Sequence, residues 1–281
     1  MVQADLHGKI CLVTGSSSGL GKATALGLAQ LQATVILGCR DKQRGEAALA
    51  SIKAASTTAT VDLLLLDLSV QQSVHAAVSE FEQRYDRLDV LINNAAVFKQ
   101  RRTLTTDGLE TMFATNHVGP FLLTNLLLER LKASPSSRIL IMTAPSTTKV
   151  DFDDLQAEKH FNALQAFGAS KTCNLLFTYE LARRLTGTHV TVNAIHPGLV
   201  KSHLMREAPA PIRWVTSLLS SKPEQAAQTV VYYASAPEVQ GMTGKFFKGR
   251  QAIDSGPYTK DQAVQQRLWE VSMALTQLEP T

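Results

Sequence analysis

The stretch AFGASKTCNLL, which begins at Ala166, places the aromatic ring of Phe167 four residues before Lys171. On a helix this spacing puts both side chains on one face, one turn apart. An aromatic hydroxyl beside a lysine could transfer a proton, but a phenyl ring has no ionisable proton. The pair is therefore either ordinary packing or a proton-transfer site that lacks its hydroxyl.

A second motif, TGSSSGLGKA at residues 14–23, is a glycine-rich turn between an apolar segment and a helical one. Glycines at these positions permit a tight turn and let the backbone approach a pyrophosphate. The helix that follows offers unpaired N–H groups and the positive end of its dipole. This context favours a dinucleotide site over an empty turn. The residues expected to contact the dinucleotide are Gly15, Ser17, Ser18, Gly19, Leu20 and Gly21.

The elements that must position these motifs alternate along the chain. Apolar segments cover residues 9–15, 34–40, 61–68, 88–96, 138–143, 189–198 and 243–249, and helical periodicity covers 21–33, 42–55, 70–85, 107–131, 160–185 and 260–278. Continuous apolar strands alternating with helices indicate a parallel sheet covered on both faces. Right-handed crossovers then give a three-layer, doubly wound α/β (Rossmann) fold. We expect one domain over residues 1–281.

Two segments depart from this alternation. Pro209 and Pro211 interrupt the chain between Lys201 and Pro223. Loops after the last strands lie at the carboxyl edge of such sheets, where ligands bind. We interpret residues 199–223 as a substrate-side flap, with a surface excursion as an equal alternative. The C-terminal helix, at about 260–278, either caps the core or meets a partner.

Composition excludes several classes of protein. Hydrophobic residues at 44% and charged residues at 19% are typical of a globular protein, and the net charge of +4 with one short basic run, KQRR at 99–102, argues against a nucleic-acid partner. No apolar run reaches the roughly 18 residues of a membrane span. Three cysteines without metal-ligand spacing predict buried, reduced thiols, no metal and a cytoplasmic location. They are Cys11, Cys39 and Cys173.

The motifs together resemble the short-chain dehydrogenase/reductase family from about Lys9 to Leu278. Besides the glycine loop, the likeness rests on LDLS (66–69), NNAA (93–96), TNHVGPF (115–121), SKTCN around Lys171 and HPGLVKS (196–202). The stretches GCRDKQRGEAA, NHVGPFLLT and RLWEVSMALTQL resemble the retinol-dehydrogenase and protochlorophyllide-reductase branch. The resemblance implies a nicotinamide-dependent oxidoreductase. It also implies a homodimer or homotetramer, because two long helices often form a dimer face in this family.

The residue at the end of the second strand decides the cofactor expected. An arginine there accommodates a 2′-phosphate, and Arg40 takes that place with Lys22 beside the glycine loop. Asp41 weakens the argument, since it would either repel a phosphate or pair with a neighbour. We expect NADP(H) rather than NAD(H). The further cofactor contacts that the resemblance implies are Asp67, Leu68, Asn94, Ala95, Lys171, Pro197, Gly198 and Ser202.

The resemblance also implies a catalytic asparagine, serine, tyrosine and lysine. Asn116 and Lys171 match two of these, but Phe167 stands at the tyrosine position and Ala144 at the serine position. Losing a positioned acid/base removes about 10²–10⁴-fold in rate, and losing an oxyanion donor costs roughly 10²–10³-fold. Ordinary alcohol–carbonyl interconversion should therefore be crippled, while Lys171 can still hold ribose hydroxyls.

Three explanations of the two vacancies remain open. The chain is an oxidoreductase with another proton donor, such as Thr143 or Ser146, that acts on a small hydrophobic carbonyl, enone or imine. Alternatively it binds cofactor without redox activity, as a pseudoenzyme, scaffold, sensor or non-redox catalyst. A deliberate Tyr-to-Phe exchange is the third, but it would not explain Ala144. Two nearby histidines fit other roles: His117 a surface or packing role, and His160 a helix start.

Overall fold

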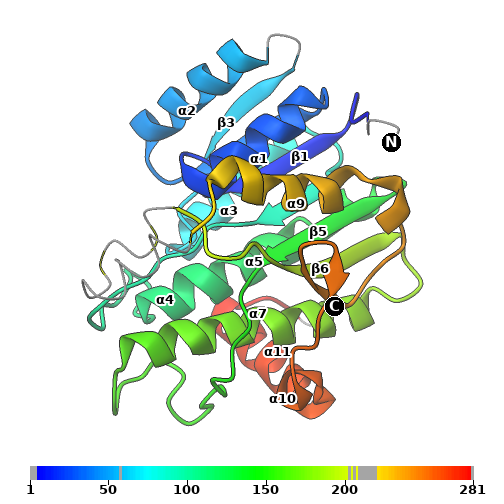
Figure 1. Cartoon of the computed structure of the whole chain (residues 1–281). Helices are drawn as coiled ribbons and strands as arrows, with labels where there is room; N and C mark the ends of the chain where they lie inside the picture. The colour runs from blue at the N-terminus through cyan, green and yellow to red at the C-terminus, as the bar shows by residue number, and fades with distance from the viewer. Residues whose placement is uncertain (1–4, 57–58, 202–203, 205–206, 208–219, 280–281) are drawn as a thin grey trace.

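One mixed sheet forms the centre of this computed structural model, which describes residues 5–56, 59–201, 204, 207 and 220–279. Among these residues the strand order is β3-β2-β1-β4-β5-β6-β7-β8 (Figure 1). Strands β1 to β7 run parallel, and β8 pairs antiparallel with β7. The strands are β1 (Ile10–Thr14), β2 (Thr34–Cys39), β3 (Val61–Leu65), β4 (Val90–Asn93), β5 (Ser137–Met142), β6 (Val190–His196), β7 (Lys245–Lys248) and β8 (Gln251–Ala252).

Helices cover both faces of the sheet, as the continuous apolar strands require. Successive residues of β1 point to opposite faces: Val13 packs in the core cluster with α1, α2 and α9, whereas Leu12 packs in the cluster with α3, α5, α7 and α11. The predicted three-layer, doubly wound fold is therefore confirmed. The helices named here are α1 (Gly19–Gln30), α2 (Lys42–Ala55), α3 (Gln71–Arg84), α5 (Gly119–Leu126), α7 (Ala163–Arg184), α9 (Pro223–Ser235) and α11 (Gln262–Thr276).

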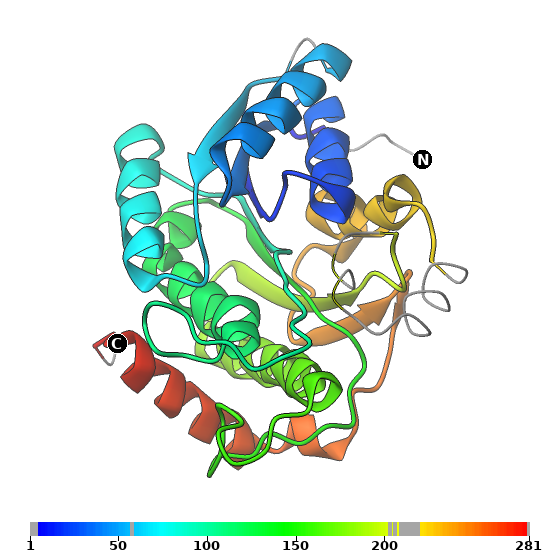
Figure 2. The same ribbon diagram turned by 90° about the vertical axis from the view of Figure 1, so that its left-hand side faces the viewer.

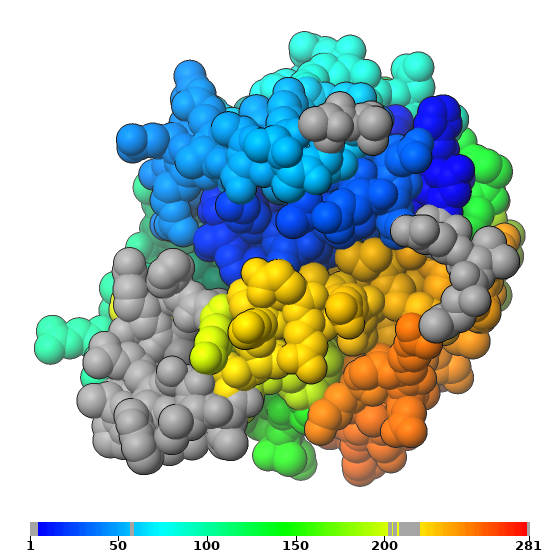
Figure 3. All heavy atoms as spheres, turned by 45° about the horizontal axis from the view of Figure 1, so that its top comes forward, coloured from blue at the N-terminus to red at the C-terminus, as the bar shows by residue number. Residues whose placement is uncertain are grey.

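Helices α1 and α9 lie side by side on the first of these faces (Figure 3). A side chain at Gly27 would place its Cβ 2.8 Å from Val231 Cγ2, so the two helices approach closely because this residue is glycine. Helix α9 was not expected from the sequence. It begins with Pro223 at its first turn and Glu224 beside it, which are common helix-start residues.

The helical region predicted at 107–131 is divided into four pieces. They are α4 (Thr111–Phe113), a π-helical segment η1 (Ala114–Val118), α5 and α6 (Leu128–Lys132). A π-helical turn holds one extra residue and is frequent at functional sites. Asn116 lies at the middle of η1, so the distortion occurs where the candidate asparagine is presented.

The C-terminal helix α11 caps the core. The Trp269 ring lies 4.9 Å from that of Phe121 in α5 and 6.1 Å from that of Phe177 in α7. Figure 2 shows α11 alongside α7. Of the two alternatives for this helix, the structure supports the cap. Part of the surface of α5 and α7 that would form a dimer face is therefore covered by the chain itself.

Most of the predicted flap at 199–223 lies outside the described residues. Its base is described: Val200 forms a parallel bridge with Ser221, and Lys201 N–H donates to Ser221 O. The three cysteines are buried, as predicted. None of the helices in the described part of the chain is long and apolar enough to cross a membrane.

Candidate active site

The glycine loop lies where the strand order reverses, between the carboxyl ends of β1 and β4. Gly15 has φ 65°, and a Cβ there would lie 2.8 Å from Ala95 Cα. A Cβ on Gly21 would lie 2.6 Å from Asn94 Nδ2 and would clash with Gly15 O. Ligands of doubly wound sheets bind at such a reversal point. Both glycines are therefore required by close packing of this crevice.

Hydrogen bonds from Thr14 and Asn94 fix the loop to the end of β4. Thr14 Oγ1 accepts from the backbone N–H of Asn94 at 2.9 Å and of Ala95 at 3.0 Å. Asn94 Nδ2 donates to Thr14 O at 2.8 Å. The Asn94 side chain thus holds the glycine loop against the end of β4. Asn94 and Ala95 both lie at the crevice.

Basic side chains gather at the end of β2. The Arg40 side chain is exposed, and Arg44 Nη2 donates to Ser18 Oγ at 3.3 Å. Asp41 caps α2 by accepting from Arg44 N–H at 2.8 Å, so its carboxylate is turned to the helix start. Arg44 was not among the residues expected at this site, although it lies in the first turn of the predicted helix that follows Arg40.

The segment after β3 is held by its own polar groups. Asp67 Oδ1 accepts from Ser69 N–H at 2.9 Å and from Ser69 Oγ–H at 2.6 Å. Asp67 is half-buried, whereas Leu68 is buried in the core with only 5% of its surface exposed. Asp67 is thus the more accessible of the two residues expected near the adenine.

Asn116 is buried, and both atoms of its side-chain amide are hydrogen-bonded to neighbouring residues. Its Oδ1 accepts from Val97 N–H at 2.7 Å, and its Nδ2 donates to Val97 O at 3.0 Å and to Ser170 Oγ at 3.0 Å. Ser170 Oγ in turn donates to Phe167 O at 2.7 Å. The asparagine therefore joins the loop after β4 to the part of α7 that carries Phe167 and Lys171.

Phe167 and Lys171 meet on one face of α7, as their spacing predicted. Lys171 Nζ lies 5.3 Å from the centroid of the Phe167 ring. That ring also contacts Phe98 edge-on, at a centroid distance of 5.7 Å. Lys171 is only 6% exposed, and burial lowers the pKa of its amine to about 8. Phe167 and Lys171 are therefore packed in the interior and also lie where the catalytic residues are expected. The pair is a buried cation over an aromatic ring that has no hydroxyl.

The hydroxyls that flank Ala144 already have partners. Thr143 Oγ1 donates to Lys171 O at 2.8 Å, and Ser146 Oγ donates to Gly168 O at 2.9 Å. Each would have to break a bond to the α7 backbone before it could donate to a substrate. Ala144 itself is half-buried at the carboxyl end of β5. Thr143 and Ser146 fasten this end of the sheet to α7.

The two histidines considered from the sequence have separate places. His117 is completely buried between aromatic rings, and burial lowers its pKa to about 4, so the packing alternative is correct and the surface alternative is wrong. His160 is exposed. Pro197 and Gly198 follow β6 and are half-buried, while Ser202 lies outside the described residues.

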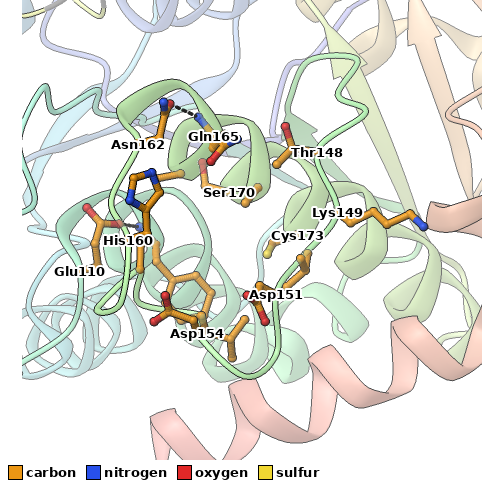
Figure 4. Close-up of a pocket in the computed structure, with 16 residues that line it drawn as sticks. Glu110, Thr148, Lys149, Asp151, Asp154, His160, Asn162, Gln165, Ser170 and Cys173 are labelled. Atoms are coloured by element: carbon orange, nitrogen blue, oxygen red, sulfur yellow. Dashed lines mark hydrogen bonds between the residues drawn. The ribbon is translucent and has the colours of Figure 1, made fainter.

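A cavity of about 290 Å³ opens on a different face of α7 (Figure 4). Helix α7 contributes Gln165, Ala166, Ala169, Ser170 and Cys173 to its lining, and the preceding segment contributes residues that include Thr148 and His160. Phe167 and Lys171 do not line it. This cavity is therefore separate from the face that carries the catalytic candidates, although Ser170 borders both.

Comparisons with known proteins agree with this geometry. The family model for the short chain dehydrogenase matches residues 9–212. Human retinol dehydrogenase 14 is 40% identical over 294 residues, covering 97% of this chain and 88% of the relative. Human retinol dehydrogenase 13 is 40% identical over 291 residues, covering 99% of this chain and 87% of the relative. The expected likeness to retinol dehydrogenases is confirmed.

Solved structures have the same fold. An uncharacterised protein from Mycobacterium paratuberculosis superposes with a TM-score of 0.80 at 31% identity, covering 100% of this chain and 98% of that one. L-Sorbose reductase from Gluconobacter frateurii, solved with NADPH and L-sorbose, superposes at 0.70 with 20% identity and 91% and 98% coverage, a likeness of fold alone. With a family model matched from β1 onward and relatives aligned over nearly its whole length, the chain belongs to the short-chain dehydrogenase family of oxidoreductases.

Proposed function

We propose that the protein is an NADP(H)-binding reductase of small hydrophobic carbonyl, enone or imine substrates, with an incomplete catalytic tetrad. The observation that supports the proposal most is that one site combines an intact cofactor-binding loop with two missing catalytic hydroxyls. The glycine loop is closely packed for a dinucleotide, yet Phe167 and Ala144 offer no oxygen to the substrate. The chain has kept the parts that bind a cofactor and lacks two that move a proton.

The preference for NADP(H) rests on charge at the end of β2. Arg40 is free to turn toward a ribose 2′-phosphate, and Arg44 lies against Ser18 of the glycine loop. The only acidic side chain of the adjoining RDKQR stretch, Asp41, is engaged at the start of α2, so it is not directed at the phosphate. Guanidinium groups suit phosphate because they donate two parallel hydrogen bonds.

The remaining cofactor contacts follow from position at the crevice. The bound dinucleotide would supply the hydride. We assign the adenine side to Asp67 and Leu68, and the adenosine ribose to Asn94 and Ala95. Lys171 would hold the nicotinamide ribose. The nicotinamide side is assigned to Pro197, Gly198 and Ser202.

The missing hydroxyls restrict the substrate. Phe167 cannot give a proton to a developing alkoxide, and Ala144 cannot donate a hydrogen bond to it. An activated double bond or an imine tolerates this loss, because its product can be protonated by water. The apolar cluster of Phe98, Met112 and Phe167 supports a hydrophobic substrate. We place the protein in the cytosol, where its three thiols would stay reduced.

A restored site tests the proposal. The double variant Phe167→Tyr, Ala144→Ser should gain NADP⁺-dependent alcohol oxidation that the natural chain lacks. The natural chain should consume NADPH with enones or imines faster than with ketones. Phe152→Tyr, which adds a hydroxyl to a partly exposed ring packed under Arg267, is the control and should gain nothing. Tight NADPH binding without a gain in the double variant would refute our account of the vacancies.

An assembly test is separate from the activity test. A homodimer or homotetramer of this chain would need a surface other than the part of α5 and α7 that Trp269 covers. Light scattering of the natural chain gives the oligomeric state. A Trp269→Ala variant should lose stability in any case, because removing a buried Trp costs about 3–5 kcal/mol.

A further inference from the structure

Among the described residues, the amine of Lys171 is buried without a counter-ion, which is unusual for a lysine. The side chain is 6% exposed, and no carboxylate in the described part of the chain contributes to its electrostatics. Lysines are almost never fully buried unless they are paired. Phe167, one helical turn before it, offers this amine a ring and no oxygen.

The neighbouring polar groups do not engage the amine either. Asn116 uses both its amide atoms on Val97 and Ser170. Thr143 Oγ1 donates to the backbone oxygen of Lys171, at the other end of the residue. The aromatic contact to the Phe167 ring, at 5.3 Å, stabilises the cation only weakly and supplies no hydrogen-bond acceptor.

This environment increases the share of neutral amine. Burial lowers the pKa of Lys171 to about 8. At pH 7.5 roughly a quarter of such an amine is neutral, whereas an ordinary lysine is neutral in only about one molecule in a thousand. A lysine desolvated in this way is a nucleophile toward carbonyl carbon.

The Phe167 ring beside the amine belongs to an apolar cluster that would receive a carbon chain. Phe98 and Met112 are buried, and Val97, Phe161 and Phe167 pack against them. At the edge of this cluster, Lys99 contacts Met112 through its backbone N–H and is paired with Glu207 at 2.7 Å, so these two charges neutralise each other. The groups next to the amine therefore favour an uncharged, hydrophobic partner over an acid or a sugar.

We propose that Lys171 reversibly captures hydrophobic aldehydes as an imine. The neutral Nζ attacks the carbonyl carbon to form a carbinolamine. The carbonyl oxygen then leaves as water with the two hydrogens of the amine, and a C=N bond forms to Nζ. No electron is gained or lost, so the step needs neither cofactor nor oxidant. It goes beyond the proposed reductase and does not depend on it.

Reductive trapping tests the proposal with the whole chain. The protein is incubated at about pH 7.5 with octanal and sodium cyanoborohydride, and peptide mass mapping locates the alkylated lysines. Lys149 is the matched reference within the same molecule, because its exposed amine also lies over an aromatic ring, 5.6 Å from that of Tyr258. Lys171 should be alkylated about tenfold faster than Lys149, because burial favours the neutral, nucleophilic form of the Lys171 amine. Equal rates, or no label on Lys171, would overturn the proposal.

Two further arms separate this proposal from the proposed function. Lys171→Arg should abolish the fast label while Lys149→Arg leaves it, and the comparison within the natural chain still decides if Lys171→Arg does not fold. Saturating NADPH should slow the label on Lys171 and leave Lys149 unchanged. A fast label that NADPH does not slow supports imine capture and contradicts our placement of the cofactor. NADPH binding without a fast label contradicts imine capture and leaves the cofactor site standing.

Discussion

His117 and Ser272 are joined by a hydrogen bond of 2.9 Å between Nε2 and Oγ, although 155 residues separate them in the chain. Both side chains are completely buried. Ser272 Oγ donates its own proton to Leu268 O at 2.7 Å, so it accepts the proton of His117 Nε2. The bond ties the C-terminal helix α11 to the residue that follows Asn116, within the π-helical segment.

Removing this acceptor should destabilise the fold. Ser272→Ala leaves the N–H of His117 buried without a partner, which costs about 1–3 kcal/mol. The melting temperature should fall by about 2–4 °C for each kcal/mol. Ser51→Ala is the control, because Ser51 is exposed on α2. Equal melting temperatures for the two variants would show that the His117–Ser272 bond does not contribute.

Acid should weaken the same region. Burial lowers the pKa of His117 to about 4 from 6.5, against a small opposing effect of the Asn174 side chain. Its other neighbours are the uncharged Phe113, Phe121, Phe177 and Ser272. The unfolded chain therefore binds a proton that the folded chain does not. The neutral, buried His117 therefore contributes fully to the free energy of unfolding above pH 6.5. This contribution is lost as the pH falls toward about 4, by about 1.4 kcal/mol per pH unit.

Urea unfolding measures this dependence. Between about pH 6.5 and 5 the histidine should remove about 2 kcal/mol of stability. His117→Gln should lose that part of the pH dependence even if its overall stability is lower. The exposed His75 provides the control His75→Gln, which should keep the slope of the natural chain. A slope in His117→Gln as steep as in the natural chain would show that another group causes it.

Strands β1 to β7 were predictable from their apolar runs, whereas the two-residue β8 (Gln251–Ala252) was not. Helix α2 begins and ends where its periodicity does, at Lys42 and Ala55. The π-helical turn at Asn116 was not. Its extra residue is stabilised by contacts with Val97 and Ser170, which are far away in sequence. Hydrophobic periodicity reports which side of a helix is buried and does not reveal one inserted residue.

The sequence allowed us to propose residues for the candidate site, but it did not predict the contacts that these residues make. Spacing alone placed Phe167 and Lys171 on one face of α7, and the structure has them there. It could not show that Thr143 and Ser146 direct their hydroxyls to α7 carbonyls. Those directions depend on how the end of β5 packs on the helix, which is tertiary structure.

Gly21 should be needed for cofactor binding more than for folding. In Gly21→Ala the new methyl group would press on Asn94 Nδ2 and on Gly15 O, so the glycine loop must shift. We expect NADPH affinity to fall by about tenfold or more, because the backbone could no longer approach the pyrophosphate. Fluorescence titration of NADPH gives the dissociation constant.

The control for this variant lies in the same helix. Gly27→Ala presses on Val231 of α9 and away from the loop. It should lower the melting temperature and leave the NADPH dissociation constant unchanged. If both variants weaken NADPH equally, the effect comes from displacement of α1 as a whole.

Arg44 should contribute to the choice between the two nicotinamide cofactors. Arg44→Ala removes a guanidinium that reaches Ser18 of the glycine loop, so NADPH affinity should fall by about tenfold, since a hydrogen bond to a charged group contributes about 1.5–3 kcal/mol. NADH, which lacks the 2′-phosphate, should bind as before. Lys42→Ala is the control, because this cation of the same helix is exposed and faces Glu46 at 3.9 Å. Equal losses for NADPH and NADH in Arg44→Ala would mean that Arg44 supports the loop through Ser18 and does not recognise the phosphate.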